Sequence, residues 1–172
     1  MDTSRPAVVL GFHHGSLGVA RSLGRLGVAV HGVDVDPGMA AMSSRYLRER
    51  LRWDVHGAPA PATVEWLLAL GERLGEAVLI ATTDPAALIV AEHADALSRR
   101  FRFPGNPPEL IRAFSDKRSL FFLARRHGIP TAGAAFPESA ADVHRYLETA
   151  TFPVMLKGID GMRLEARTGK QM

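Results

Sequence analysis

The sequence predicts an α/β fold, in which a parallel β-sheet is covered by helices on both faces. Three short apolar runs, each bounded by turn residues, are typical of buried strands: residues 6–12, 28–35 and 77–81. Helical patterns separate these runs, and strands that alternate with helices of roughly 10–15 residues form parallel sheets. The expected architecture of this region is therefore Rossmann-like.

Helices and a further strand fill the intervals between these three strands. A helix is expected from Gly15 to about Leu26 because apolar residues recur on one of its faces, and Gly27 is placed to end it. A short, arginine-rich strand is expected within residues 46–55, and a helix over residues 61–75.

The residues after the third apolar run predict another helix. Asp84 suits the N-cap position and Pro85 the first helical position, so the helix is expected to continue to about Arg99. The sequence pattern then changes. We expect one domain over residues 1–105 and an incomplete second domain over residues 106–172.

The second region is expected to contain three helices with recognisable starts. Residues 106–109 begin the first, residues 115–117 open the second, which ends at Gly128, and residues 139–142 form a capping box for the third. Two strands are also expected here, at residues 131–136 and 152–158.

The composition excludes several classes of function. The 172 residues contain no cysteine, which rules out disulfides, thiolate zinc sites and cysteine nucleophiles and fits a cytoplasmic location. No apolar run approaches about 18 residues, so we expect no membrane-spanning helix. The net charge is only +3, and the arginine-rich stretches lie on separate predicted elements with few aromatic residues. Solvated helix faces and strand edges are expected there rather than a nucleic-acid surface. These stretches are residues 45–52, 99–100 and 125–126.

The turn after the first strand carries the first candidate site. Gly11, Gly15 and Gly18 are spaced G-x-x-x-G-x-x-G, unlike the G-x-G-x-x-G of dinucleotide-binding proteins. Such glycines leave helix N–H groups open toward an anion, and Asp34 ends the second strand where a ribose-binding acid would lie. The other interpretation is that Gly15 and Gly18 allow close helix–sheet packing and that Asp34 caps a turn.

Two adjacent histidines, His13 and His14, lie in the same turn. They lack further ligands at metal-binding spacing, and the other five histidines are scattered, so no metal site is expected. The serine at position 16 likewise lacks the spacing of a nucleophile elbow.

The lysines form the second candidate site. The chain has 18 arginines but only three lysines, Lys117, Lys157 and Lys170. Lys117 is expected in the first turn of a helix, where a cation opposes the helix dipole, and Lys157 ends an apolar strand. Each could be a surface cation or a member of an ion pair. Amines that converge from different elements would also suit the charges of a triphosphate.

Three motifs in the second region resemble the start of an ATP-grasp domain. They are Asp116-Lys117 at a helix start, the turn Gly128-Ile129-Pro130, and the run from Phe152-Pro153-Val154 to Lys157. In that superfamily both lysines contact the nucleotide. Residues 1 to about 105 resemble the pre-ATP-grasp domain of biotin carboxylase and carbamoyl-phosphate synthase, and their turns resemble the carboxylate–amine ligase branch. These turns are residues 11–18, 33–34 and 82–84.

The resemblance implies an ATP-dependent carboxylate–amine ligase that works through an acyl phosphate. Lys117 and Lys157 would bind ATP, and Mg²⁺ would accompany the nucleotide. The substrates would be a small carboxylate and an amine, and the resemblance is compatible with a homodimer. Residues 158–167 contain only scattered glycines where the family often has a glycine-rich lid, and the family's Mg²⁺ ligands would lie beyond this chain. The chain is therefore expected to be the front portion of such a ligase and inactive alone.

The carboxylate substrate is expected at the carboxyl ends of the strands, where α/β folds bind ligands. The candidate residues for it are Gly11, His13, Gly15, Ser16, Thr83 and Asp84. Two alternatives stay open. One is a stand-alone nucleotide- or small-molecule-binding module without catalysis, and the other is an NAD(P)-binding oxidoreductase domain that Gly15, Gly18 and Asp34 would serve.

Overall fold

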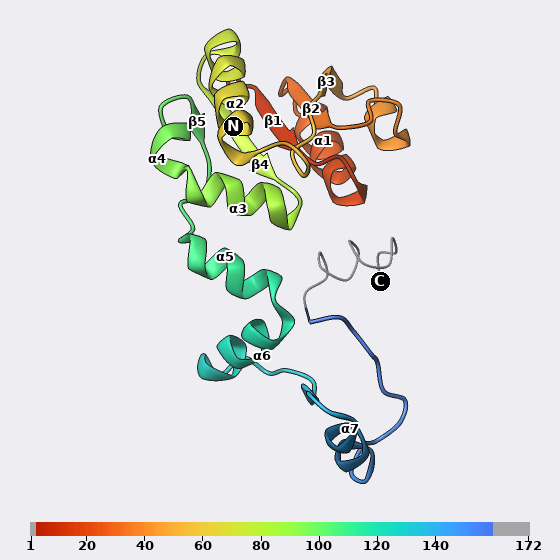
Figure 1. The fold of residues 1–172 in the computed structure, drawn as a ribbon. Helices are drawn as coiled ribbons and strands as arrows, with labels where there is room; N and C mark the ends of the chain where they lie inside the picture. The colour runs from red at the N-terminus through yellow and green to blue at the C-terminus, as the bar shows by residue number, and fades with distance from the viewer. Residues whose placement is uncertain (1–2, 160–172) are drawn as a thin grey trace. The chain divides into compact units, whose positions relative to one another are not determined.

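The first unit of the chain, residues 1–111, is built around a parallel sheet with the strand order β3-β2-β1-β4-β5 (Figure 1). The computed structural model describes residues 3–159. The strands are β1 (Ala7–Leu10), β2 (Val30–Asp34), β3 (Leu47–Arg52), β4 (Ala77–Ala81) and β5 (Phe101–Arg102). The three apolar runs and the arginine-rich strand are therefore confirmed as β1, β2, β4 and β3.

Helices cover both faces of this sheet. The apolar residues of α1 (His14–Arg25) and of the short 3₁₀ helix η1 (Ala40–Ser43) pack on one face. Those of α2 (Ala60–Leu74), α3 (Asp84–Glu92) and α4 (Ala94–Leu97) pack on the other. The predicted Rossmann-like architecture is confirmed.

Alternating side chains of the central strands feed two apolar cores. Val8 and Leu10 of β1 belong to the core beneath α2, where Leu67 is fully buried. Val9 belongs to the core beneath α1, together with Phe12 and Met42. The period of two along β1 thus buries both faces of the strand, as a central strand of a parallel sheet requires.

The region after β4 differs from its prediction. The helix expected to reach Arg99 is two helices, because the backbone leaves helical geometry at His93 (φ −115°, ψ 25°). The bend lets α4 bury Leu97 and returns the chain to the sheet, where Phe101 of β5 is buried beside β4. A strand of two residues is too short to show a hydrophobic period, and the sequence therefore did not reveal it.

The ends of the helices are mostly as expected. Gly27 and Gly128 have positive φ angles and follow the last turns of α1 and of α6 (Lys117–Arg126). At the start of α3, however, the N-cap is Thr83, whose backbone is extended, and Asp84 is the first helical residue. Because a first-turn carboxylate also meets the positive end of the helix dipole, Asp84 suits this position as well. Among residues 3–159, no helix combines the length and apolar content needed to span a membrane.

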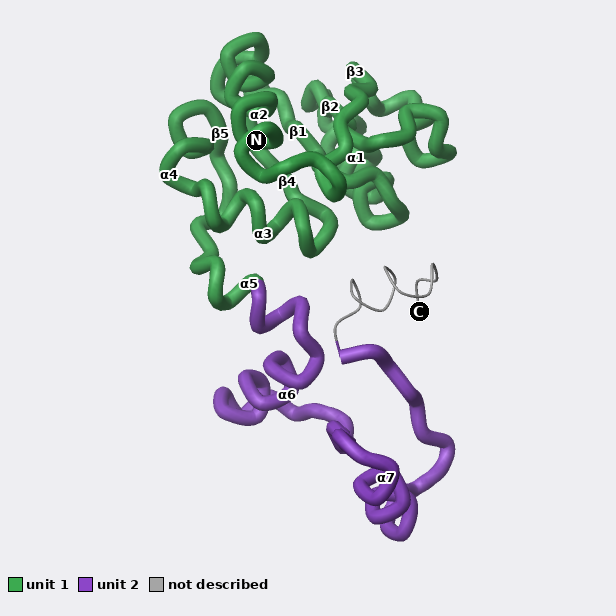
Figure 2. Tube along the Cα trace, in the orientation of Figure 1, with its two compact units in different colours: residues 1–111 green, residues 112–172 purple. Residues whose placement is uncertain are grey.

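The second unit, residues 112–172, contains α6 and α7 (Ala140–Leu147), and α5 (Pro108–Ser115) spans the division between the units (Figure 2). The sequence predicts the domain boundary slightly earlier, between residues 105 and 106. The capping box at the start of α7 is confirmed: the Asp142 N–H donates to Ser139 Oγ at 3.2 Å, and Asp142 Oδ2 accepts from the Ser139 N–H at 3.0 Å.

The two strands expected in the second unit are not formed, and this part of the prediction is wrong. Residues 131–136 and 152–158 have no strand geometry. A strand needs neighbours that satisfy its backbone groups, and the described part of the second unit contains no other strand to pair with.

Candidate functional site

The loops that follow β1 and β4 meet at the carboxyl end of the parallel strands. These strands are neighbours, but the chain leaves them in opposite directions, through α1 to β2 and through α3 and α4 to β5. Such a topological switch point is where open α/β sheets bind ligands. The Thr82 N–H donates to the Leu10 carbonyl at 3.1 Å and joins the two loops.

Two hydroxyl groups converge on one carbonyl oxygen in these loops. Ser16 Oγ donates to the Gly11 carbonyl at 2.6 Å and accepts from the His13 N–H at 2.8 Å. The Thr82 hydroxyl donates to the same carbonyl at 2.5 Å and lies 3.2 Å from Ser16 Oγ. The structure thus brings three predicted site residues together with Thr82. The sequence analysis missed Thr82, although its hydroxyl at the end of a strand was a signal.

Gly11 lets the two loops approach each other closely. Its φ of 76° lies in the left-handed region, and a Cβ atom there would lie 2.6 Å from Thr83 Cγ2. Any other residue would strain the backbone and push the loops apart. The Thr83 hydroxyl is buried beside Gly11 and has no hydrogen-bond partner among the described residues. Buried hydroxyls without partners are rare, which makes Thr83 a candidate donor for a bound ligand.

The exposed candidates lie at the starts of two helices. His13 and Gly15 flank the first residue of α1, and Asp84 begins α3. First-turn N–H groups carry partial positive charge and attract anions. The first turn of α1 has no acidic residue, whereas Asp84 places a carboxylate in that of α3. An oxyanion is therefore better accommodated at the start of α1.

The structure also bears on the open interpretations of Asp34 and the glycines. Asp34 is buried, and its carboxylate accepts from the Phe12 N–H at 2.6 Å and the Asp36 N–H at 3.2 Å. Both oxygens hold loops in place, so the turn-capping interpretation fits better than a ribose contact. A Cβ at Gly15 or Gly18 would meet nothing within 4 Å, so close helix–sheet packing does not explain these glycines.

The two lysine-bearing segments meet within the second unit. Lys117 begins α6, and its N–H donates to the Ile159 carbonyl at 3.0 Å, two residues after Lys157. Asp116 is the N-cap, and its Oδ1 accepts from the Ser119 N–H at 2.7 Å. Hydrogen bonding to Ser119 holds the pKa of Asp116 below its ordinary value, which keeps a carboxylate beside Lys117. No three His, Cys, Asp or Glu side chains group into a metal-binding cluster among residues 3–159.

No protein-family model matches the sequence, and no curated protein matches it significantly. Solved structures are similar. An L-amino acid ligase from Bacillus licheniformis has a TM-score of 0.64 at 15% identity, with 98% of this chain and 42% of that one covered. An N5-carboxyaminoimidazole synthetase from Staphylococcus aureus complexed with ADP has a TM-score of 0.64 at 15% identity, with 94% and 40% covered.

A third solved structure is similar with a lower TM-score. The biotin carboxylase domain of a single-chain bacterial carboxylase has a TM-score of 0.52 at 24% identity, with 95% of this chain and 39% of that one covered. The likeness shows that the chain has the fold of part of each of these proteins. The chain spans 39% to 42% of their length.

Proposed function

We propose that the chain is the N-terminal portion of an ATP-dependent carboxylate–amine ligase of the ATP-grasp family. In this proposal Lys117 and Lys157 bind the phosphates of ATP, and the loops after β1 and β4 bind the carboxylate substrate. The observation that carries it is the hydrogen bond between Lys117 and Ile159, which joins the two lysine-bearing segments although they are forty residues apart in the sequence.

The two lysines would act through charge rather than covalent chemistry. A substrate carboxylate oxygen attacks the γ-phosphorus of ATP, ADP leaves, and an acyl phosphate results. An amine then attacks the acyl carbon and displaces phosphate to form an amide. Ammonium groups that neutralise the phosphate oxygens stabilise the charge that develops on them. Mg²⁺, when bound with ATP, would supply further positive charge to the phosphates.

The loops of the first unit offer the chemistry that a carboxylate needs. The first turn of α1 presents N–H groups and has no acidic residue, and the buried Thr83 hydroxyl has no hydrogen-bond partner within residues 3–159. A small carboxylate that accepted from both would supply the missing hydrogen bond. A nicotinamide dinucleotide would need a free ribose-binding acid, whereas Asp34 already accepts two backbone hydrogen bonds.

Calorimetric titration of ATP into the purified chain tests the nucleotide part of the proposal. We expect Lys117→Ala and Lys157→Ala each to weaken binding roughly tenfold, as loss of a charge-assisted contact does. Arg126→Ala removes the same charge from the exposed far end of α6 and should leave the affinity within about twofold. Equal affinities for all four proteins, or tighter binding of NADH than of ATP, would contradict the proposal.

A further inference from the structure

A hollow lies at the amino end of the parallel strands, whereas the Gly11 loop lies at their carboxyl end. It has a volume of about 630 Å³ and is formed by the end of α1, the residues before β2, and the start of β3. Its lining includes Gly24, Val28, Arg45, Tyr46 and Arg48 and contains no acidic residue. Small-molecule sites commonly have volumes of roughly 300–1,000 Å³, so the hollow is large enough for a small ligand.

Cations gather around one phenol oxygen at this hollow. Arg45 Nη2 donates to the Tyr46 hydroxyl at 3.0 Å, and the Arg45 guanidinium lies 5.0 Å from the centre of the Tyr46 ring. Hydrogen bonds from Arg45 and from Arg25 lower the pKa of Tyr46. The Arg45 guanidinium therefore bonds to a neutral acceptor, and no carboxylate is among the residues that line the hollow.

Other arginines of the first unit contrast with this arrangement. Arg73 binds both oxygens of Glu49, at 3.1 and 2.9 Å, and Arg102 pairs with Glu76. Arg45 instead donates to the neutral Tyr46 hydroxyl, and a bound anion would supply a negative charge beside it.

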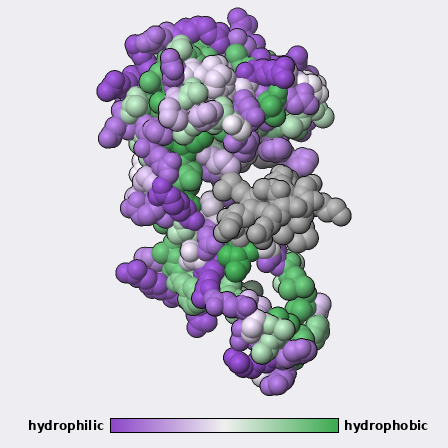
Figure 3. Space-filling view, viewed as in Figure 1, coloured by the Kyte–Doolittle hydropathy of each residue, from purple (hydrophilic) through white to green (hydrophobic). Residues whose placement is uncertain are grey.

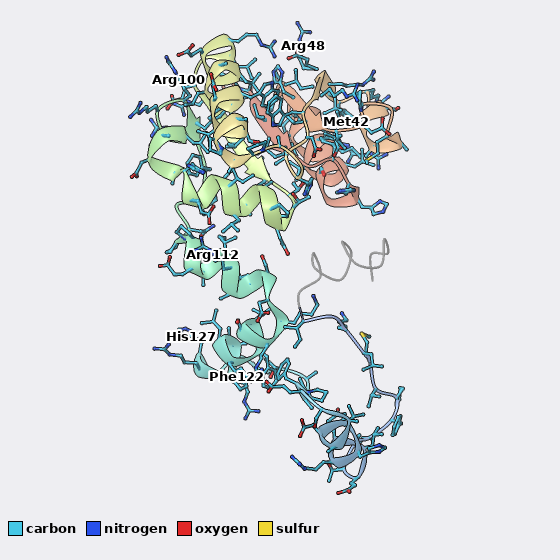
Figure 4. All side chains as sticks on the ribbon, viewed as in Figure 1. Met42, Arg48, Arg100, Arg112, Phe122 and His127 are labelled. Atoms are coloured by element: carbon cyan, nitrogen blue, oxygen red, sulfur yellow. The ribbon has the colours of Figure 1, made fainter. Side chains whose placement is uncertain are left out.

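A β-bulge places a second arginine at the hollow. Val30 pairs with Leu47, but His31 pairs with Glu49, so Arg48 is an extra residue between the two pairs. Bulges redirect the side chain they carry and are common next to functional sites. Arg48 lines the hollow and is exposed at the start of β3, where Figure 4 labels it.

The position of Tyr46 is fixed by close packing. A Cβ at Gly24, near the end of α1, would lie 2.6 Å from the Tyr46 Cβ, so α1 and the residues before β3 touch at this point. The acceptor that holds Arg45 therefore lies where two elements pack together. An acceptor that packing holds in place lowers the entropic cost of ordering Arg45 when an anion binds.

We propose that this hollow binds the phosphate group of a small phosphorylated molecule. A phosphate dianion suits a hollow lined by two arginines better than a single carboxylate does, because it offers more acceptor oxygens and a second negative charge. No lysine and no residue of the Gly11 loop is among the residues that line the hollow, and the proposal does not rest on the ligase proposal.

The test measures binding of inorganic phosphate and of glycerol 3-phosphate to the full chain by calorimetry. Both Arg45→Gln/Arg48→Gln and Arg50→Gln/Arg52→Gln remove two positive charges from β3 or from the residues just before it, but only the first pair lines the hollow. We expect the first double variant to lose roughly tenfold or more in affinity and the second to stay within about twofold. Tighter binding of glycerol 3-phosphate than of inorganic phosphate would identify an organic phosphate as the ligand, and the reverse order would identify the free ion.

Equal weakening in both double variants would overturn the proposal, because it would indicate a diffuse positive field rather than a site. Absence of binding to the wild type would overturn it as well. Should the first double variant fail to fold, Arg48→Gln with Arg50→Gln as its control repeats the test at two exposed positions. The comparison of these variants is independent of the ATP titration, because neither Lys117 nor Lys157 lines the hollow.

Discussion

The two units of the chain differ most in what they do with their apolar side chains. The first unit buries them on both faces of its sheet, whereas Ala124 is the one buried apolar residue among residues 112–159. Of the large apolar residues exposed in the described part of the chain, all but Leu26 and Val35 lie beyond residue 111. The first unit is therefore stabilised by its own apolar core, whereas residues 112–159 form no comparable core.

The contrast is sharpest between two leucines. Leu67 of α2 is fully buried, whereas Leu156 is 88% exposed, and the neighbouring Met155 is 77% exposed. Figure 3 shows apolar surface along the segment that follows α7, which contains both exposed residues. An apolar run forms a core only when a neighbouring element covers it, and the described residues supply such a neighbour only to the runs of the first unit.

Truncating a leucine in each unit is the strongest test of this comparison. Leu67→Ala should lower the free energy of unfolding by about 2–5 kcal/mol, because it leaves a cavity in the core. Leu156→Ala should change it by less than about 0.5 kcal/mol, because the side chain is already exposed. Urea unfolding followed by circular dichroism measures both. Similar losses in the two variants would break the comparison.

Glycine substitutions probe how rigidly the first unit holds its site loops. Gly11→Ala should cost about 1–2 kcal/mol for the left-handed backbone alone, with a further cost from the contact with Thr83. Gly18→Ala is the matched control, since it lies within α1 and its Cβ would meet nothing. That variant should gain about 0.5–1 kcal/mol from helix propensity. Destabilisation by both would show that α1 is not packed as described.

The cap of α7 tests whether the second unit unfolds separately. Ser139→Ala removes a hydroxyl that accepts from the Asp142 N–H, which should cost α7 about 1 kcal/mol. With so little core around it, α7 should respond by faster amide exchange over residues 140–147, while the urea midpoint of the first unit stays unchanged. Ser22→Ala, exposed within α1, serves as the control. A fall in the midpoint for Ser139→Ala would indicate that the two units unfold together.

The smallest expected effect concerns pH. The Arg73 guanidinium holds the pKa of Glu49 below its ordinary value near 4.5, and His31 lowers this pKa to a smaller extent. The ionised Glu49 side chain therefore contributes its full stabilisation above the ordinary pKa. This stabilisation is lost as the pH falls through the lowered pKa of the folded state. Glu49→Gln should reduce stability at neutral pH and flatten its acid dependence, measured by urea midpoints between about pH 3 and 7. Glu65→Gln, exposed on α2, should do neither.

The sequence predicted the parts of the fold that depend on local patterns. Apolar runs revealed β1, β2 and β4, and glycines marked the ends of α1 and α6. The same reasoning failed for residues 152–158, because a strand also needs a partner and an apolar run does not show whether one exists. It missed β5 for the opposite reason: Phe101 is held by its neighbours rather than by a pattern of its own.

The site was less predictable than the fold, since it depends on contacts between distant residues. The loops after β1 and β4 were identified because strand ends meet at a switch point. Position 11 must be glycine partly because Thr83, 72 positions away, leaves no space for a Cβ atom. The choice between the two interpretations of Asp34 depended on the hydrogen bond that it accepts from the Phe12 N–H. The bulge at Arg48 depends on register, which composition does not reveal.

The most direct test of the account is to map where ATP binds by hydrogen–deuterium exchange on the full chain. If the lysines of the second unit hold the phosphates, ATP should slow exchange around residues 115–120 and 152–159 and leave the loop from Gly11 to Ser16 unchanged. Protection confined to that loop of the first unit would contradict the account, because the nucleotide would then bind at the switch point of the sheet.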